Sequence, residues 1–232
     1  GGAWMDECLN KAKDEDGEDI IPVAYLVCNQ TPPSNGKPSL MSFDEVLTLF
    51  HEFGHGLQHM LTTVDLPQAA GINNVEWDAV ELPSQFMENW CFDKTTLLNI
   101  AKHWETGEKL PEEDYNKLCE NRTFNCGMAT LRQLHFAITD LRLHSNQSKY
   151  HGQEPDQIRR DIAQNTTVID PILEDKFLCC FSHIFAGGYS AGYYSYKWAE
   201  VLSADAFSMF EESDLENNQN VKKIGKKFKD TV

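Results

Sequence analysis

The sequence predicts a mainly α-helical fold with a small β-sheet. Apolar side chains recur at spacings of three and four residues in several long segments, as they do along one face of a helix. Residues 20–28 are the best candidate for a strand, because they combine strand length with many β-branched and other apolar residues; Pro22 lies near their start. A chain of 232 residues can bury one sizeable core, so one or two domains are expected.

The first long helix is expected to begin directly after Ser42. Ser42 and Glu45 have the three-residue spacing of a capping box, in which each side chain bonds to the other's backbone. Glycines are poor helix formers, so we expect Gly54 and Gly56 to let another backbone approach closely. An apolar stripe at helical spacing is expected to face the core, and it consists of Val46, Leu49, Phe50, Phe53, Leu57 and Met60.

The rest of the chain is expected to be mostly helical with short connections. Helices are predicted around Pro83, from the acidic start at 111–114, over residues 131–143, after the turn at 152–155, and over residues 198–210 and 221–232. Pro83 fits best in the first turn of its helix or at a kink. The helix over residues 131–143 is expected to be long and largely buried.

The most informative stretch, residues 51–55, reads HEFGH and lies within the first long helix. His51 and His55 are four residues apart, so both imidazoles lie on one helical face and can bind the same metal ion. Glu52 is adjacent and can reach a water molecule on that metal. Two neutral nitrogen ligands suit zinc, and a carboxylate beside zinc-bound water suits peptide hydrolysis. The motif therefore predicts a zinc peptidase in which Glu52 assists the attack of zinc-bound water.

A catalytic zinc site needs a third protein ligand. His59 lies eight residues beyond His51, or about 12 Å along a helix axis, so a rigid helix cannot bring it to the same ion. We expect His59 to support a ligand, face the substrate or be solvated. The segment 73–90 offers four carboxylates, and spacing alone does not choose among Glu76, Asp78, Glu81 and Glu88. A solvated acidic face is the alternative interpretation of this segment.

Residues 51–55, followed by the run ELPSQFMENW at 81–90, resemble the thimet oligopeptidase family of zinc peptidases, most closely its oligopeptidase A branch. The resemblance covers residues 1–232. It implies that Glu81 is the third zinc ligand. It also implies the expected fold class, a multihelical zincin-like metallopeptidase catalytic region, with residues 1–232 as one catalytic domain. On this interpretation the family's N-terminal lobe and extreme C-terminus lie outside the chain. Glu88, and after it Asp78, is expected to orient a zinc-bound imidazole.

A glycine- and tyrosine-rich loop at residues 183–196 matches a loop of the same family. The resemblance implies that His183, Tyr189 and Tyr196 lie over the scissile peptide, with His183 contacting the substrate and the tyrosines steadying the oxyanion. The spacing from His183 to Tyr189 follows the oligopeptidase A and dipeptidyl carboxypeptidase pattern.

The tyrosine loop also has a physical rationale of its own. A phenol O–H aimed at a developing oxyanion stabilises it where water is excluded. Gly187 and Gly188 relax the backbone, so the loop is expected to move over bound substrate. The alternative is a core aromatic cluster that opens the amphipathic segment 198–210.

These residues predict an oligopeptidase A-like zinc metalloendopeptidase that hydrolyses peptide bonds in short oligopeptides. Zinc is the expected cofactor, and short peptides are the expected partners. A dipeptidyl carboxypeptidase is the enzymatic alternative, and a non-catalytic, zinc-stabilised helical module is an alternative of another class. Glu52 argues against the second alternative, because a structural zinc needs no general base.

Composition narrows the possible partners and compartments. The formal net charge of −16 disfavours nucleic acid, whose phosphates need a basic surface. A mean hydropathy of −0.47 and the lack of a long apolar run predict a soluble protein with no membrane partner. Seven cysteines without a CxxC pair, and no signal peptide at the start of the chain, predict a reducing compartment. The cytoplasm is expected, with an organelle stroma or matrix as the alternative.

Overall fold

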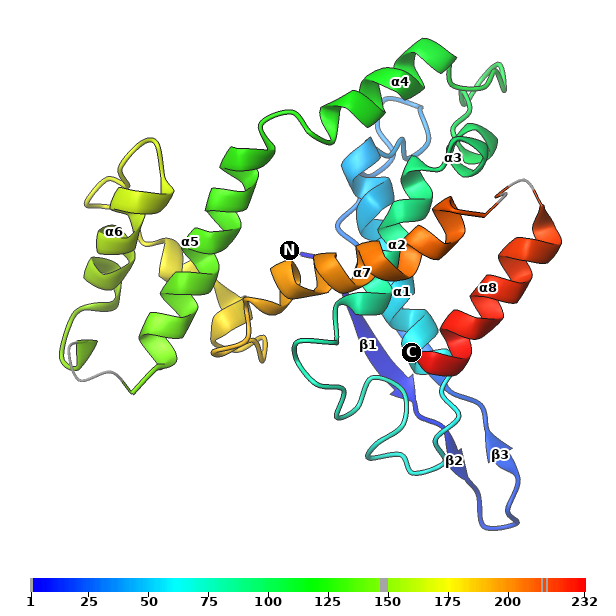
Figure 1. Cartoon of the computed structure of the whole chain (residues 1–232), viewed down its shortest axis with the longest axis horizontal. Helices are drawn as coiled ribbons and strands as arrows, with labels where there is room; N and C mark the ends of the chain where they lie inside the picture. The colour runs from blue at the N-terminus through cyan, green and yellow to red at the C-terminus, as the bar shows by residue number, and fades with distance from the viewer. Residues whose placement is uncertain (1, 147–149, 214, 216) are drawn as a thin grey trace. The chain divides into compact units, whose positions relative to one another are not determined.

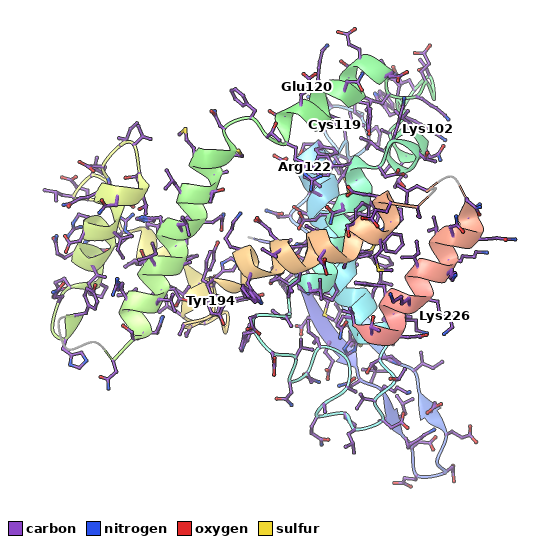
Figure 2. The ribbon with its side chains drawn as sticks, in the orientation of Figure 1. Lys102, Cys119, Glu120, Arg122, Tyr194 and Lys226 are labelled. Atoms are coloured by element: carbon purple, nitrogen blue, oxygen red, sulfur yellow. The ribbon has the colours of Figure 1, made fainter. Side chains whose placement is uncertain are left out.

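The computed structural model of the chain describes residues 2–146, 150–213, 215 and 217–232. It divides into two compact units, one formed by Gly1–Cys119 with Ala199–Val232 and the other by Glu120–Trp198. The first boundary falls between Cys119 and Glu120, which Figure 2 labels.

The expected mainly helical fold with a small β content is confirmed (Figure 1). The described α-helices are α1 (Phe43–Met60), α2 (Leu82–Asn89), α3 (Lys94–Ile100), α4 (Glu112–Asn121), α5 (Cys126–His144), α6 (Pro155–Thr166), α7 (Ser195–Glu211) and α8 (Asn218–Thr231). Short 3₁₀ helices lie at η1 (Trp90–Phe92), η3 (Phe177–Cys180) and η4 (Ser182–Ile184). No helix in the described part of the chain is both long and apolar enough to cross a bilayer.

The strands form two small antiparallel sheets rather than one. β1 (Trp4–Leu9) pairs with β4 (Val23–Val27), and β2 (Ala12–Lys13) pairs with β3 (Asp19–Ile20). The single strand expected over residues 20–28 is therefore divided at Pro22. Proline has no N–H to donate and a fixed φ, so it interrupts a ladder, and the flanking residues join different partners.

Helix α1 begins as predicted. Ser42 Oγ accepts the backbone N–H of Glu45 at 3.3 Å, and the Glu45 carboxylate accepts the N–H of Ser42 at 2.7 Å. The expected apolar core stripe is wrong in part, because Phe53 is 40% exposed and Met60 37%. The buried residues of α1 are Glu52, Gly54, His55, Gly56 and His59.

Glycine explains why this polar face lies inward. A Cβ on Gly54 would lie 2.5 Å from Ser84 Cα and closer still to the Pro83 carbonyl oxygen, so the backbones of α1 and α2 are in direct contact. The two helices lie side by side in Figure 1. At Gly56 the neighbour is a side chain of β4, since a Cβ there would lie 3.3 Å from Leu26 Cδ2. The expected close approach of a backbone is therefore confirmed at Gly54 only.

Each unit has its own aromatic core. In the first unit Phe86 of α2 packs against Phe207 and Phe210 of α7, and it stacks on Phe228 of α8 at a centroid distance of 4.0 Å. In the second unit the core comprises Phe136, Ala137, Leu178, Phe181, Ile184 and Tyr193. The expectation that residues 131–143 are largely buried is wrong in part, because α5 leaves three of its leucines 38–41% exposed: Leu131, Leu134 and Leu141.

Candidate metal site and catalytic residues

Two side chains of α1 and one from the start of α2 converge in the first unit. His51 and His55 extend from adjacent turns of α1, and Glu81 is the residue directly before α2. Glu81 Oε2 lies 3.2 Å from His51 Nε2 and 3.3 Å from His55 Nε2. One ligand atom from each residue lies within 4.8 Å of the others, and no other such group of His, Cys, Asp or Glu occurs among the described residues.

These separations suit a tetrahedral zinc ion. With metal–ligand bonds of about 2.0–2.1 Å, two ligand atoms in a tetrahedron lie about 3.3 Å apart. Both nitrogen-to-carboxylate distances match that value. The donor set of two imidazoles and one carboxylate is also that of catalytic zinc sites that keep a further position open. The residues therefore fit the metal that the sequence motif predicts.

The fold selects one carboxylate from the four that the sequence left open. Glu81 is 0% exposed and is the one whose oxygen reaches both imidazoles. Glu76 is exposed, and Asp78 is half-buried but lies outside the group. The position that the family resemblance implies for the third ligand is thus the position that the structure brings to the histidines.

Ser84, which the sequence interpretation missed, holds the Glu81 side chain. Its hydroxyl donates to Glu81 Oε2 at 2.8 Å and lies 3.0 Å from the Glu81 carbonyl oxygen. Pro83 lies in the first turn of α2, as expected, so the chain turns into the helix directly after Glu81. The available signal was a serine three residues after a glutamate at a helix start, which places the two side chains together.

Glu88 orients His51, as predicted for a carboxylate that supports a ligand. Its Oε1 lies 2.6 Å from His51 Nδ1, which leaves Nε2 directed at Glu81. In contrast, Nδ1 of the buried His55 has no hydrogen-bond partner among the described residues. A carboxylate thus holds one of the two rings, and the other is held by its burial and its contact with Glu81.

Electrostatics also favour a cation between these residues. Burial opposes protonation of His51, but hydrogen bonds to Glu81 and Glu88 outweigh burial and raise the pKa of His51 to about 10. Burial likewise disfavours ionised Glu81, yet the bonds to His51 and His55 hold its pKa well below the usual value. Positive charge at the His51 imidazole is therefore strongly stabilised, and a divalent ion would take the place of that proton.

Glu52 lies beside this group on α1 and is 5% exposed. Burial raises the pKa of its carboxyl, and the negative charge of Glu81 adds to the increase, while positive charge on His51 and His55 opposes it. A carboxyl whose pKa is raised toward neutrality is better matched to accepting and returning a proton than an exposed one.

His59 has none of the roles expected for it. The side chain is 0% exposed, so it neither faces substrate nor is solvated. Its Nε2 lies 2.9 Å from the carbonyl oxygen of Leu9, and its ring lies against Gly71, which has a φ of +62°. His59 instead ties the end of β1 to α1. The residues around His59 in the sequence do not indicate this contact, because Leu9 lies 50 residues away.

The predicted loop residues meet in the second unit. Tyr189 stacks on Tyr196, with ring centroids 5.2 Å apart and an interplanar angle of 18°. The His183 ring lies 6.0 Å from Tyr189 and 6.3 Å from Tyr196. His183 is exposed and both tyrosines are half-buried.

The core-cluster interpretation of this aromatic segment holds for one residue, and the catalytic interpretation stays a prediction. Tyr193 belongs to the core, and its hydroxyl lies 3.1 Å from Gln133 Oε1. Tyr194, labelled in Figure 2 where the loop enters α7, is 39% exposed. Gly187 has a steric purpose, because a Cβ there would lie 2.8 Å from His183 Cα. Movement of the loop over substrate stays a prediction.

Comparison with known proteins adds an independent observation. Residues 1–232 match the description "Peptidase family M3". An organellar oligopeptidase A, chloroplastic/mitochondrial, of Arabidopsis thaliana is 58% identical over 238 residues, which cover 100% of this chain and 30% of that protein. A probable cytosolic oligopeptidase A of the same plant is 56% identical over 234 residues, covering 100% and 33%. Oligopeptidase A of Escherichia coli is 48% identical over 232 residues, covering 100% and 34%. The chain spans about a third of the length of these curated relatives, and the resemblance expected from the motifs is confirmed.

Proposed function

Since this chain belongs to peptidase family M3, we propose that residues 1–232 form the zinc-dependent catalytic region of an oligopeptidase A-like endopeptidase that hydrolyses short oligopeptides. The observation that carries the proposal is the convergence of His51, His55 and Glu81 beside the buried carboxyl of Glu52. The names of the relatives support peptides as the substrate class. A reducing compartment, either cytosolic or organellar, fits the seven unpaired cysteines.

In this mechanism His51, His55 and Glu81 would hold the metal, while Glu88 and Ser84 fix the orientation of two of those side chains. Zinc bound there would act as a Lewis acid that polarises the peptide carbonyl and lowers the pKa of water. Glu52 accepts the proton of the attacking water and delivers it to the leaving amine.

The tyrosine loop supplies oxyanion donors and a substrate contact in the proposed mechanism. The O–H groups of Tyr189 and Tyr196 donate to the oxyanion that forms at the scissile carbonyl, and His183 contacts the substrate. Such donors are most effective where they are held in place before reaction, because no reorganisation is then needed as charge develops. The stacking of the two tyrosine rings supports this assignment.

Glu52→Gln in the whole zinc-loaded protein is the decisive test. The amide preserves shape but accepts no proton at neutral pH, so we expect kcat to fall by about 10²–10⁴-fold. Zinc content should be unchanged, because Glu52 is not a ligand. The assay is cleavage of an internally quenched peptide that is blocked at both ends. An endopeptidase cuts such a peptide, whereas a dipeptidyl carboxypeptidase does not, because release of C-terminal dipeptides requires a free carboxylate. Turnover of the variant close to that of wild type would remove Glu52 from the mechanism.

A further inference from the structure

The second unit contains a buried carboxylate that the chemistry above does not use. Asp140 lies near the C-terminal end of α5, four residues before its last residue, and is 0% exposed. A carboxylate in an apolar interior is costly unless hydrogen bonds or charges compensate for lost water. The core of this unit consists of aromatic and aliphatic side chains. The partners of Asp140 therefore indicate what the residue does.

Both oxygens of Asp140 accept backbone N–H groups of the tyrosine loop. Oδ1 accepts from Ala191 at 2.8 Å, and Oδ2 accepts from Tyr193 at 2.9 Å. Oδ1 also lies 2.7 Å from Nδ1 of His144, one turn farther along α5. Hydrogen bonds from a backbone amide to an ionised carboxylate are shorter and stronger than those between neutral groups. A single side chain thus clamps the loop at two places.

The clamped backbone is in a conformation that needs such a restraint. Ala191 has a φ of +58°, in the left-handed region that residues with a Cβ rarely adopt. Within the loop, Tyr189 N donates to the His183 carbonyl at 2.9 Å, and Ser190 Oγ donates to the Ile184 carbonyl at 2.7 Å. These local bonds shape the turn before Ala191. The Asp140 carboxylate satisfies the donors that follow it and connects the turn to α5.

We propose that Asp140 is a positioning residue for peptide hydrolysis, which clamps the loop backbone so that Tyr189 and Tyr196 present their hydroxyls in one fixed arrangement. The clamped amides lie between the two tyrosines in sequence, so a displaced turn moves both rings. This inference rests on the proposed function. It assigns Asp140 no contact with substrate; its effect passes through the loop.

The test uses Asp140→Asn in the whole zinc-loaded protein. The amide keeps the size of the side chain but turns one acceptor into an NH₂ group that faces a backbone N–H. Because a misplacement of about 1 Å can cost about 10²-fold in rate, we expect kcat to fall by about 10–100-fold. KM should change far less, and zinc content should stay at the wild-type value.

Thr139→Val is the matched control. Thr139 precedes Asp140 on α5 and is 1% exposed, and its hydroxyl donates to the His135 carbonyl within the same helix at 2.7 Å. The substitution removes a buried hydrogen bond beside the clamp and leaves the loop bonds in place. Unchanged kcat in Thr139→Val, together with reduced kcat in Asp140→Asn, supports the proposal. Equal losses in both variants would overturn it, because they would reflect damage to α5 alone.

A mutant cycle shows whether Asp140 acts through the tyrosines. Removing one oxyanion donor typically costs about 10²–10³-fold, so Tyr189→Phe and Tyr196→Phe should each lower kcat by that order. In the background that carries both changes, Asp140→Asn should cost little more, because residues that act as one unit are not additive. Losses that multiply would overturn the proposal, and so would wild-type kcat in Asp140→Asn.

His144→Gln keeps the proposal testable if Asp140→Asn does not fold. The side chain of His144 is 25% exposed, so its replacement is a milder change that removes one of the carboxylate's donors. We expect a smaller kcat loss that again disappears in the double tyrosine variant, and a wild-type kcat would overturn the proposal. If Tyr189→Phe and Tyr196→Phe both keep wild-type kcat, the oxyanion role fails and this inference fails with it. If they lose kcat and neither α5 variant does, only the role of Asp140 fails.

Discussion

Gly54→Ala should separate the two helices that build the metal site. The added methyl would lie 2.5 Å from Ser84 Cα, where ordinary contact begins at 3.4 Å, so α1 and α2 must move apart by about 1 Å. The obstructing atoms are backbone atoms, which no rotamer change can displace. His51 and His55 lie on α1 and Glu81 lies at the start of α2, so the movement separates the ligands themselves.

The expected loss in zinc affinity follows from this geometry. Metal–ligand distances in protein sites stay within about 0.2 Å of their preferred values, so a separation of about 1 Å takes Glu81 out of bonding range. Even the loss of a partner that only orients a ligand costs about 10–100-fold in affinity, and we expect at least the upper end of that range. The free energy of unfolding should change less than the free energy of zinc binding, because overpacking costs about 1–3 kcal/mol while alanine stabilises the helix by about 1 kcal/mol relative to glycine.

Zinc affinity is measured by competition with a chromophoric chelator, and urea unfolding of the metal-free protein gives the free energy of unfolding. Gly56→Ala is the control on the same helix, because its methyl meets the movable Leu26 side chain at 3.3 Å. It should keep wild-type zinc affinity. Wild-type zinc affinity in Gly54→Ala would refute the idea that contact between the two backbones sets the distances between the ligands.

Two buried residues of the first unit, Ser84 and Cys91, give further predictions. Ser84→Ala removes the hydroxyl that holds Glu81 Oε2 and should weaken zinc binding by about 10–100-fold with a smaller effect on folding; unchanged affinity in the same competition assay would contradict this role. Burial raises the pKa of the Cys91 thiol to about 12, and the charge of Glu88 adds to the increase. Only roughly 10⁻⁴ of this thiol is therefore ionised at pH 8, so a thiol reagent should label Cys91 long after the exposed Cys179 and Cys180. The thiol of the unfolded chain ionises near its ordinary pKa of 9.0, so ionisation of Cys91 also makes the free energy of unfolding decline as pH rises from about 9 to 12. Mass spectrometry of partly labelled protein checks the order of labelling, and urea midpoints across that pH range check the decline in stability.

The sequence by itself determined the features that depend on neighbours along one helix. The capping box of Ser42 and Glu45 and the shared face of His51 and His55 follow from helical spacing, which is the same in any fold. The expectation that Glu88 supports a ligand was also met, because a metal-bound imidazole needs a partner for its second nitrogen and Glu88 shares a helical face with Glu81.

Only the tertiary structure decided features that depend on contacts between distant segments. It chose Glu81 among four carboxylates, since burial against α1 is not a property of local spacing. It turned His59 inward to the Leu9 carbonyl and directed Asp140 to amides 51 and 53 residues away. An unpaired polar group is too costly to bury, so each of these side chains lies where a partner from another segment is available. The sequence names the chemical groups, whereas packing decides which of them meet.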